Sequence, residues 1–316
     1  MASADEGTTG AGPTAPTAPA PHHPTAAGSA AAFGAVALWG FGNVLIAWIP
    51  MNGLALGVYR LGLGAAVYTA WLYFRGGRLS VDRFRWGWFG GVAFGLDIAT
   101  FFLAVQNTSV SIAVTLSALQ PVVIAGVAAA AFGERIRARH IIGTVVAVPA
   151  VALVAFGAED SGVTSTFGNV MAVAALFAWS AYFIGSKKAR EKMPTMDYMA
   201  VMNIVAFVTI TVIAVPSGVL WSSDAQMNWR NAALVVCVLA VPGTGHIVMN
   251  WAHGHTTLML TSLATLTMPV ISTLGAWVFL DQSVTWTQLV GIAIVLAALT
   301  YVVIGDSREM PRVTAD

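Results

Sequence analysis

Long apolar segments alternate with short polar ones along most of the chain. From Ala31 onward the apolar segments are about 18 to 25 residues long, the length of a helix that crosses a hydrocarbon layer of roughly 30 Å. The pattern therefore predicts an all-α integral membrane protein with ten transmembrane helices. The predicted spans are residues 31–49, 53–74, 87–106, 109–131, 140–157, 167–186, 198–220, 232–252, 257–279 and 286–304.

The composition excludes a soluble globular protein. Of the 316 residues, 57% are hydrophobic and 9% are charged, whereas about a quarter of the residues in a soluble domain are charged. Residues 1–30 are rich in Ala, Pro, Thr and Gly and contain no Lys or Arg, so they predict a disordered cytoplasmic tail rather than a signal peptide. Residues 305–316 form a second predicted cytoplasmic tail. The net charge of +1 argues against nucleic acid as a partner.

The positive charges predict the orientation of the chain, because short cytoplasmic loops carry an excess of Lys and Arg. Of the 15 Lys and Arg residues, only Arg230 falls in a predicted outer loop and only Arg60 falls inside a span. This distribution predicts that both termini are cytoplasmic and that the protein lies in the cytoplasmic membrane. The remaining basic residues are Arg75, Arg78, Arg83, Arg85, Arg135, Arg137, Arg139, Lys187, Lys188, Arg190, Lys192, Arg308 and Arg312.

The chain contains an internal repeat. A shift of 148 residues aligns Pro121 with Pro269, Glu134 with Gln282 and Gly143 with Gly291. The predicted repeats cover residues 31–157 and 167–304. Because each repeat would cross the membrane five times, the second copy is predicted to be inverted relative to the first. Inverted repeats are typical of secondary transporters, in which the substrate site lies near the bilayer midplane between the halves.

Several motifs resemble those of a known family. They are Trp39-Gly40 and Asn43 in the first span, Arg60 in the second, and the two copies of the repeated block, residues 121–143 and 269–291. Together they resemble the ten-helix EamA type of the drug/metabolite transporter superfamily. The resemblance implies the export of small metabolites, often amino acids or related compounds. The tail and Gln282, which stands where the family has Glu, depart from this pattern and receive no family role.

Asp97 is the only acidic residue inside a predicted span. A carboxylate near the bilayer centre costs at least about 2.5 kcal/mol and is rarely kept without a partner or a water-filled cavity. We therefore expect Asp97 to bind a proton or a substrate ammonium group. Two alternatives are an ion pair with Arg60, which is predicted to lie at a similar depth, and a wrongly placed span.

The eighth span contains Pro242, Gly243 and Gly245, which are predicted to interrupt its helix. His246 and Asn250 follow, and their spacing of four places them on one helix face. The hypothesis is that Asp97 and His246 reach one central cavity from the two halves. The alternative is a packing histidine satisfied by hydrogen bonds.

Further residues are candidates for lining a substrate site. Trp39 and Asn43 share a face of the first span, and Trp179 and Tyr182 are close together on the sixth. Gln120, beside Pro121, offers a neutral hydrogen-bonding group. Each of these residues has a packing role as its alternative, since aromatic and small polar side chains also pack membrane helices.

The sequence favours a transporter over an enzyme. It lacks a phosphate-binding Walker motif and a nucleophile elbow, and with only Cys237 as a thiol it predicts no metal site and no cofactor. The predicted function is export of a small metabolite by alternating access, with the lipid bilayer and a small-molecule substrate as partners and proton coupling as a hypothesis. Alternatives are a phosphorylated-sugar or nucleotide-sugar carrier, an intramembrane enzyme that uses Asp97 and His246, and a lipid-scaffolding or receptor-like role.

Overall fold

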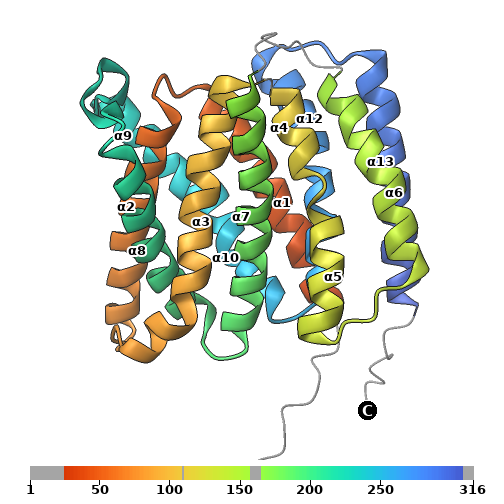
Figure 1. The fold of residues 1–316 in the computed structure, drawn as a ribbon, viewed down its shortest axis with the longest axis horizontal. Helices are drawn as coiled ribbons and strands as arrows, with labels where there is room; N and C mark the ends of the chain where they lie inside the picture. Colours follow the sequence, from red (N-terminus) through yellow and green to blue (C-terminus); the bar gives the residue numbers. More distant parts are fainter. Residues whose placement is uncertain (1–24, 109, 157–164, 309–316) are drawn as a thin grey trace, which may run out of the picture.

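The computed structural model describes residues 25–108, 110–156 and 165–308. Within these ranges the regular structure is entirely helical, and most helices run side by side in one bundle (Figure 1). The first half contains α1 (Ala26–Ala47), α2 (Gly53–Phe74), α3 (Val81–Asn107), α4 (Val110–Ser117), α5 (Gln120–Phe132) and α6 (Ala138–Phe156). The second half contains α7 (Thr166–Arg190), α8 (Thr195–Ala214), α9 (Trp229–Val238), α10 (Thr244–His253), α11 (Leu258–Ala264), α12 (Met268–Leu280) and α13 (Trp286–Ser307).

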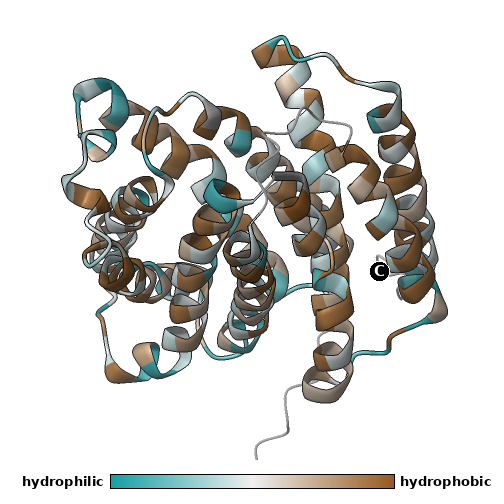
Figure 2. Cartoon of the chain, turned by 45° about the horizontal axis from the view of Figure 1, so that its top comes forward, coloured by the Kyte–Doolittle hydropathy of each residue, from teal (hydrophilic) through white to brown (hydrophobic). Residues whose placement is uncertain are grey.

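Nine helical segments of the described chain are long and apolar enough to cross a membrane. The segment α2 is also 22 residues long, but Arg60 and three tyrosines lower its hydropathy, and it is not among the nine. The protein is therefore a multi-pass membrane protein, while the tenth span stays a prediction. Apolar residues predominate along the helices, and polar residues are most frequent near the helix ends and in the connections (Figure 2).

The basic residues of the described chain gather at one end of the bundle, which we call the basic end. The connections from α2 to α3 and from α5 to α6 lie there, as do the end of α7, the start of α1 and the end of α13 (Figure 1). Arg60 and Arg230 lie elsewhere, as the sequence predicts. The largest differences in helix starts are that α1 begins at Ala26 rather than at residue 31 and that α3 begins at Val81, so Arg83 and Arg85 lie on a helix rather than in a loop. The end of α7 at Arg190 likewise places Lys187 and Lys188 on a helix.

Side-chain caps explain both early starts. The hydroxyl of Thr25 accepts a hydrogen bond from the Gly28 N–H, and that of Ser80 accepts one from the Arg83 N–H. Such caps satisfy amide groups that lack helical partners. The first turns of α3 are polar, so the hydrophobic pattern alone could not detect them. The predicted tail up to residue 24 lies outside the described residues.

Two of the predicted continuous spans are broken helices. The fourth is divided between α4 and α5 at residues 118–119, and the ninth has a 3₁₀ segment, η4 (Thr265–Thr267), between α11 and α12. The two breaks are related by the 148-residue offset of the repeat. In the eighth span the predicted interruption is a π-helical segment, η3 (Leu239–Gly243), which contains Pro242 and leads directly into α10.

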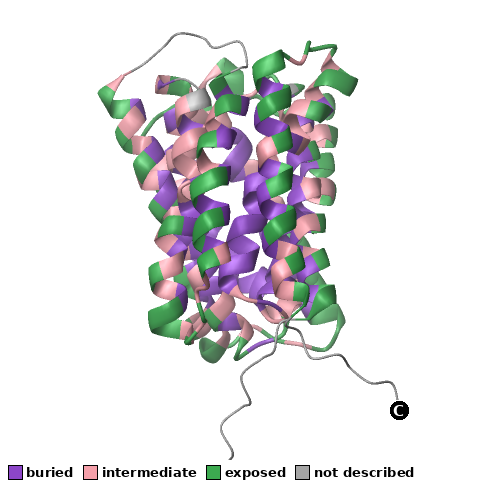
Figure 3. Ribbon diagram, turned by 90° about the vertical axis from the view of Figure 1, so that its right-hand side faces the viewer, coloured by how far each residue is buried: buried purple, intermediate pink, exposed green. Residues whose placement is uncertain are grey.

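The buried core lies along the centre of the bundle (Figure 3). Within it α3 packs along α7 and α8, α2 packs along α8, and α1 packs along α10, while α6 packs along α13. The α3–α7 contact is close because both helices have glycine where they meet. A Cβ atom added to Gly185 would lie 3.0 Å from the backbone of Gly90.

Matching contacts join the halves at opposite ends of the bundle. At the basic end, the N–H and hydroxyl of Thr25 donate to the His255 carbonyl at 2.9 and 3.1 Å. At the other end, the hydroxyl of Ser165 donates to the Asn107 carbonyl at 2.6 Å. Thr25 and Ser165 cap α1 and α7, and His255 and Asn107 are related by the 148-residue offset. The halves are therefore joined through equivalent residues at opposite ends of the bundle.

Candidate functional site

Arg60 on α2 and Asp97 on α3 are both partly buried inside the bundle. They do not form an ion pair with each other in the described structure. The guanidinium carbon of Arg60 lies 5.9 Å from the centroid of the Phe94 ring, a distance typical of a cation–π contact. The structure therefore does not contain the ion pair that was the alternative role of Asp97, because Arg60 lies against an aromatic ring instead.

An aromatic cluster joins the two halves beside these charges. His246 is at its centre: the centroid of its ring lies 4.6 Å from that of Phe94 and 4.8 Å from that of Trp39. Trp39 also contacts Trp179 at 5.2 Å. The cluster draws on α1, α3, α7 and α10, and its members are Trp39, Phe94, Trp179, Tyr182, Phe183 and His246.

A chain of buried hydrogen bonds extends from the cluster toward the basic end. The hydroxyl of Tyr182 lies 3.3 Å from Nδ1 of His246 and donates to Oδ1 of Asn250 at 3.3 Å. Ser186 also donates to Oδ1 of Asn250, and its hydroxyl lies 2.7 Å from Nδ1 of His253. Residues four apart share a helix face, so α7 presents Tyr182 and Ser186 together to His246 and Asn250 of α10.

These bonds fix the orientation of the polar groups in the cluster. Asn250 has no exposed surface, and its amide nitrogen donates to the sulfur of Met199 at 3.1 Å. Its side chain thus has partners on α7 and α8, and it holds the Tyr182 hydroxyl beside His246. A buried polar group that loses its partner costs about 1–3 kcal/mol, so the network resists rearrangement.

Arg60 approaches the cluster through Phe94. The Phe94 ring also contacts the rings of Tyr182 and His246, with centroids 4.8 and 4.6 Å away. No hydrogen bond joins Asp97 to His246 in the described part of the chain. The two residues hypothesised to meet are therefore not bonded to each other directly. The site combines one cation, one anion and aromatic surface.

Two predicted site residues lie apart from the cluster. Asn43 is exposed, and its amide donates to the hydroxyl of Ser272 on α12 at 2.9 Å. Gln120 is fully buried between the broken helices, where its Oε1 accepts hydrogen bonds from Ser262 and Thr265, both at 3.2 Å. Sequence spacing suggested Asn43 as a neighbour of Trp39, but their side chains contact different helices.

The family of the protein follows from a match to one family model in both halves of the chain. A model of the EamA-like transporter family matches residues 26–156 and again residues 166–304. The chain belongs to the EamA-like transporter family. This confirms the resemblance noted in the sequence, and both matched segments of the EamA-like chain contribute residues to the aromatic cluster.

Comparison with solved structures supports the fold of this EamA-like protein. A chain described only as "Crystal structure of protein" superposes with a TM-score of 0.72 at 20% sequence identity, and the match covers 89% of this chain and 98% of that one. No curated protein matches the sequence. The likeness extends over nearly the whole bundle, and at this identity it concerns the fold alone.

Sequence reasoning on the EamA-like chain missed several residues that the structure brings to these contacts. Phe94 and Ser186 had no distinguishing pattern within their apolar segments. Glu134 was noticed only as the partner of Gln282 in the repeat, although its place directly after a Gly at the end of a helix indicates a turn. A second alignment of the sequence with itself, at an offset of 140 residues, pairs Trp39 with Trp179 and Gly28 with Gly168. This alignment was the sequence signal that could have identified residues at the contacts between the halves.

Proposed function

We propose that this EamA-like membrane transporter exports small metabolites, specifically amino acids or related compounds, by alternating access. The observation that carries the proposal is the pair Arg60 and Asp97, which lie unpaired with each other beside an aromatic cluster shared by the two repeats. Buried charges without mutual pairing are costly in a membrane protein and mark functional sites.

The chemistry of the site supports a zwitterionic substrate. The guanidinium group of Arg60 suits a carboxylate, which it can bind through two parallel hydrogen bonds. The carboxylate of Asp97 suits an ammonium group. The rings of Trp39 and Trp179 provide the apolar surface on which the remainder of a small amphipathic metabolite would pack.

Proton coupling follows from competition at Asp97. A carboxylate binds either a proton or an ammonium group, so proton binding would release the substrate ammonium. Alternating exposure of Asp97 to the two sides would then exchange a proton for a substrate. Asp97 would serve both proton coupling and substrate recognition, and the substitution of Asp97 by its neutral isostere Asn would abolish both.

A phosphorylated-sugar or nucleotide-sugar carrier is the second candidate, favoured by the cationic Arg60. One guanidinium group beside an anion is a poor match for a phosphate dianion, which is better stabilised by several cations. An intramembrane acid/base enzyme is supported less, because Asp97 and His246 are not hydrogen-bonded to each other in the described structure.

The positive charge at the basic end supports a location in the cytoplasmic membrane with the basic end facing the cytoplasm. In this orientation both termini are cytoplasmic, and export carries substrate from the basic end to the opposite end. Inverted membrane vesicles expose the basic end to the medium, so an exporter accumulates external substrate inside them.

The test uses inverted vesicles that receive an external mixture of amino acids, amines, purines and sugar phosphates, with accumulation read by mass spectrometry. We expect accumulation of amino acids that requires a proton gradient and is lost in Asp97→Asn. Asp224→Asn, a matched change in a connection outside the helices that form the site, should retain transport. Accumulation of sugar phosphates alone would establish the second candidate, and no accumulation by folded protein would overturn the proposal.

A further inference from the structure

The connection between α10 and α11, residues 254–257, is held from several sides at the basic end. Thr25 and Ser29 at the start of α1 contact its His255 carbonyl and Thr256 hydroxyl. Nζ of Lys187 on α7 donates to the carbonyls of His253 at 3.3 Å and Thr256 at 2.8 Å. The connection is thus attached to α1 of the first repeat and α7 of the second.

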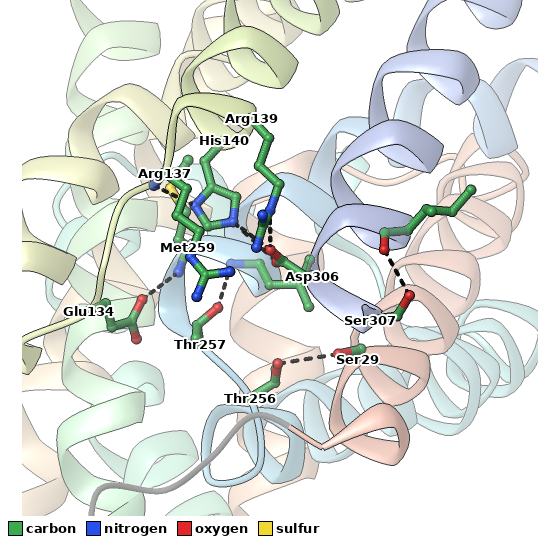
Figure 4. Close-up of polar contacts among 12 residues, drawn as sticks. Ser29, Glu134, Arg137, Arg139, His140, Thr256, Thr257, Met259, Asp306 and Ser307 are labelled. Atoms are coloured by element: carbon green, nitrogen blue, oxygen red, sulfur yellow. Dashed lines mark hydrogen bonds and ion pairs between the residues drawn. The ribbon is translucent and has the colours of Figure 1, made fainter. Parts of the chain in front are cut away.

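Glu134 completes this arrangement from the end of α5. Its Oε1 accepts a hydrogen bond from the Leu258 N–H at 2.6 Å, and its Oε2 accepts one from the Met259 N–H at 3.0 Å. Figure 4 shows the Glu134 carboxylate facing Met259. Both carboxylate oxygens are therefore used by the first turn of α11.

The charge of Glu134 is also paired. Nζ of Lys187 lies 3.4 Å from Oε1 of Glu134, and the two side chains are only 14% and 8% exposed. Hydrogen bonds between a carboxylate and backbone N–H groups are stronger than neutral ones, particularly with little water nearby. One carboxylate of the first repeat thus binds two elements of the second, and α5 packs against α11.

Among the described residues, the matching position at the opposite end has no such contact. The turns after α5 and α12 are alike: Gly133 and Asp281 both have a left-handed backbone, with φ of 62° and 53°. Glu134 and Gln282 follow these turns, and their N–H groups donate to the equivalent carbonyls of Ala128 and Ala276. The Gln282 side chain, however, is exposed and has no hydrogen-bond partner among the described residues.

We infer that Glu134 is a charge-dependent latch that holds the transporter closed at the basic end, and that Gln282 leaves the opposite end without a counterpart. This inference rests on the proposed alternating-access function. Opening the basic end requires α5 to separate from α11, which breaks the contacts of Glu134 with Leu258, Met259 and Lys187. The latch therefore sets which side of the protein is closed in the absence of substrate.

The substitution Glu134→Gln tests the role of the charge with little change in shape. The amide retains one acceptor for a backbone N–H, loses the attraction to Lys187, and places an NH₂ group where one oxygen accepted a bond. Glu191→Gln is the matched control, because Glu191 is an exposed acidic residue after α7 that makes no ion pair in the described structure. Lys187→Met is a second test that leaves Glu134 intact.

The measurement is the distance between spin labels in the purified full-length protein, in a Cys237→Ser background that removes the single native cysteine. One label pair, at Ala131 and Lys188, reports the basic end. A second pair, at Gln106 and Val278, reports the opposite end. All four positions are exposed.

We expect Glu134→Gln to add a longer distance at the basic end and a shorter one at the opposite end, with the ratio of open to closed basic-end populations raised about tenfold or more. Lys187→Met should shift both pairs in the same directions, and Glu191→Gln should match the parent. Unchanged distances in Glu134→Gln and Lys187→Met, or broadening of both pairs without opposite shifts, would overturn the latch. Because these distances are measured without substrate, they test the latch independently of the proposed transport.

Discussion

Trp39 and Trp179 meet edge to face with their ring centroids 5.2 Å apart. One belongs to the first helix of the first repeat and the other to the first helix of the second, 140 positions later. Corresponding residues of two repeats touch where the repeats meet, so this contact marks the junction of the halves. His246, Tyr182 and Phe94 surround the same point, and Arg60 lies against the Phe94 ring there.

Substitution of Arg60 should discriminate between substrates with and without a carboxylate. Loss of a charged hydrogen-bonding partner costs about 1.5–3 kcal/mol, so Arg60→Gln should weaken transport of an amino acid by about 10- to 100-fold. Transport of the corresponding amine should change much less. Competition between the two compounds in vesicles measures the effect, with Arg230→Gln as the control at a basic residue outside the site. An equal loss for both compounds would contradict carboxylate binding by Arg60.

Asn250→Ala should destabilise the protein by about 1–3 kcal/mol, because the hydroxyls of Tyr182 and Ser186 lose a buried acceptor. Denaturation in detergent gives the free energy of unfolding. Asn43→Ala provides the comparison, since Asn43 is exposed and its loss should cost less than about 1 kcal/mol. Similar losses for both variants would show that the hydrogen-bond chain contributes little.

A side chain at Gly28 should destabilise the protein, because α1 lies very close to the α10–α11 connection at this residue. An added Cβ would lie 2.4 Å from the carbonyl oxygen of His255, and such overpacking costs about 1–3 kcal/mol. Gly34→Ala in the same helix meets no atom within 4 Å and should stabilise the helix slightly. Thermal unfolding of the two variants should therefore shift in opposite directions.

Asp306 joins the end of α13 to the start of α6. Its Oδ1 accepts from Nε of Arg139 at 2.6 Å, and Nε2 of His140 lies 3.1 Å from the same oxygen (Figure 4). Because these side chains are largely buried, Asp306→Asn should lower the free energy of unfolding by about 1–3 kcal/mol. Asp224→Asn, in a connection at the opposite end, should leave unfolding unchanged. An unaltered unfolding midpoint for Asp306→Asn would show that apolar packing alone stabilises the contact between α6 and α13.

Predictions from the sequence agree with the structure where the signal is local. The long apolar segments appear as helices, and charge counting placed the basic residues at one end of the bundle. The predicted interruption near Pro242 appears as a π-helical segment because proline removes a helical hydrogen bond. The early starts of α1 and α3 were missed, since caps and polar first turns have no apolar pattern.

The contacts of the site were less predictable. The i, i+4 spacing correctly placed His246 and Asn250 on one face, and both lie beside Tyr182. The same rule did not bring Asn43 to the cluster, because spacing along one helix does not reveal which neighbouring helix each side chain meets. The direct pairing of Arg60 with Asp97 also depends on how α2 and α3 are rotated, and Arg60 contacts Phe94 instead.

The sequence by itself determined that this chain is a helical membrane protein with a basic end and an internal repeat, because hydrophobic length, charge and repetition are properties of the linear chain. Only the tertiary structure decided that Tyr182 links His246 to Asn250 and that Glu134 reaches α11, more than a hundred residues away. Those contacts depend on the rotation and packing of helices from both repeats. Similar apolar surfaces on many helices leave these relationships undefined until the whole bundle is assembled.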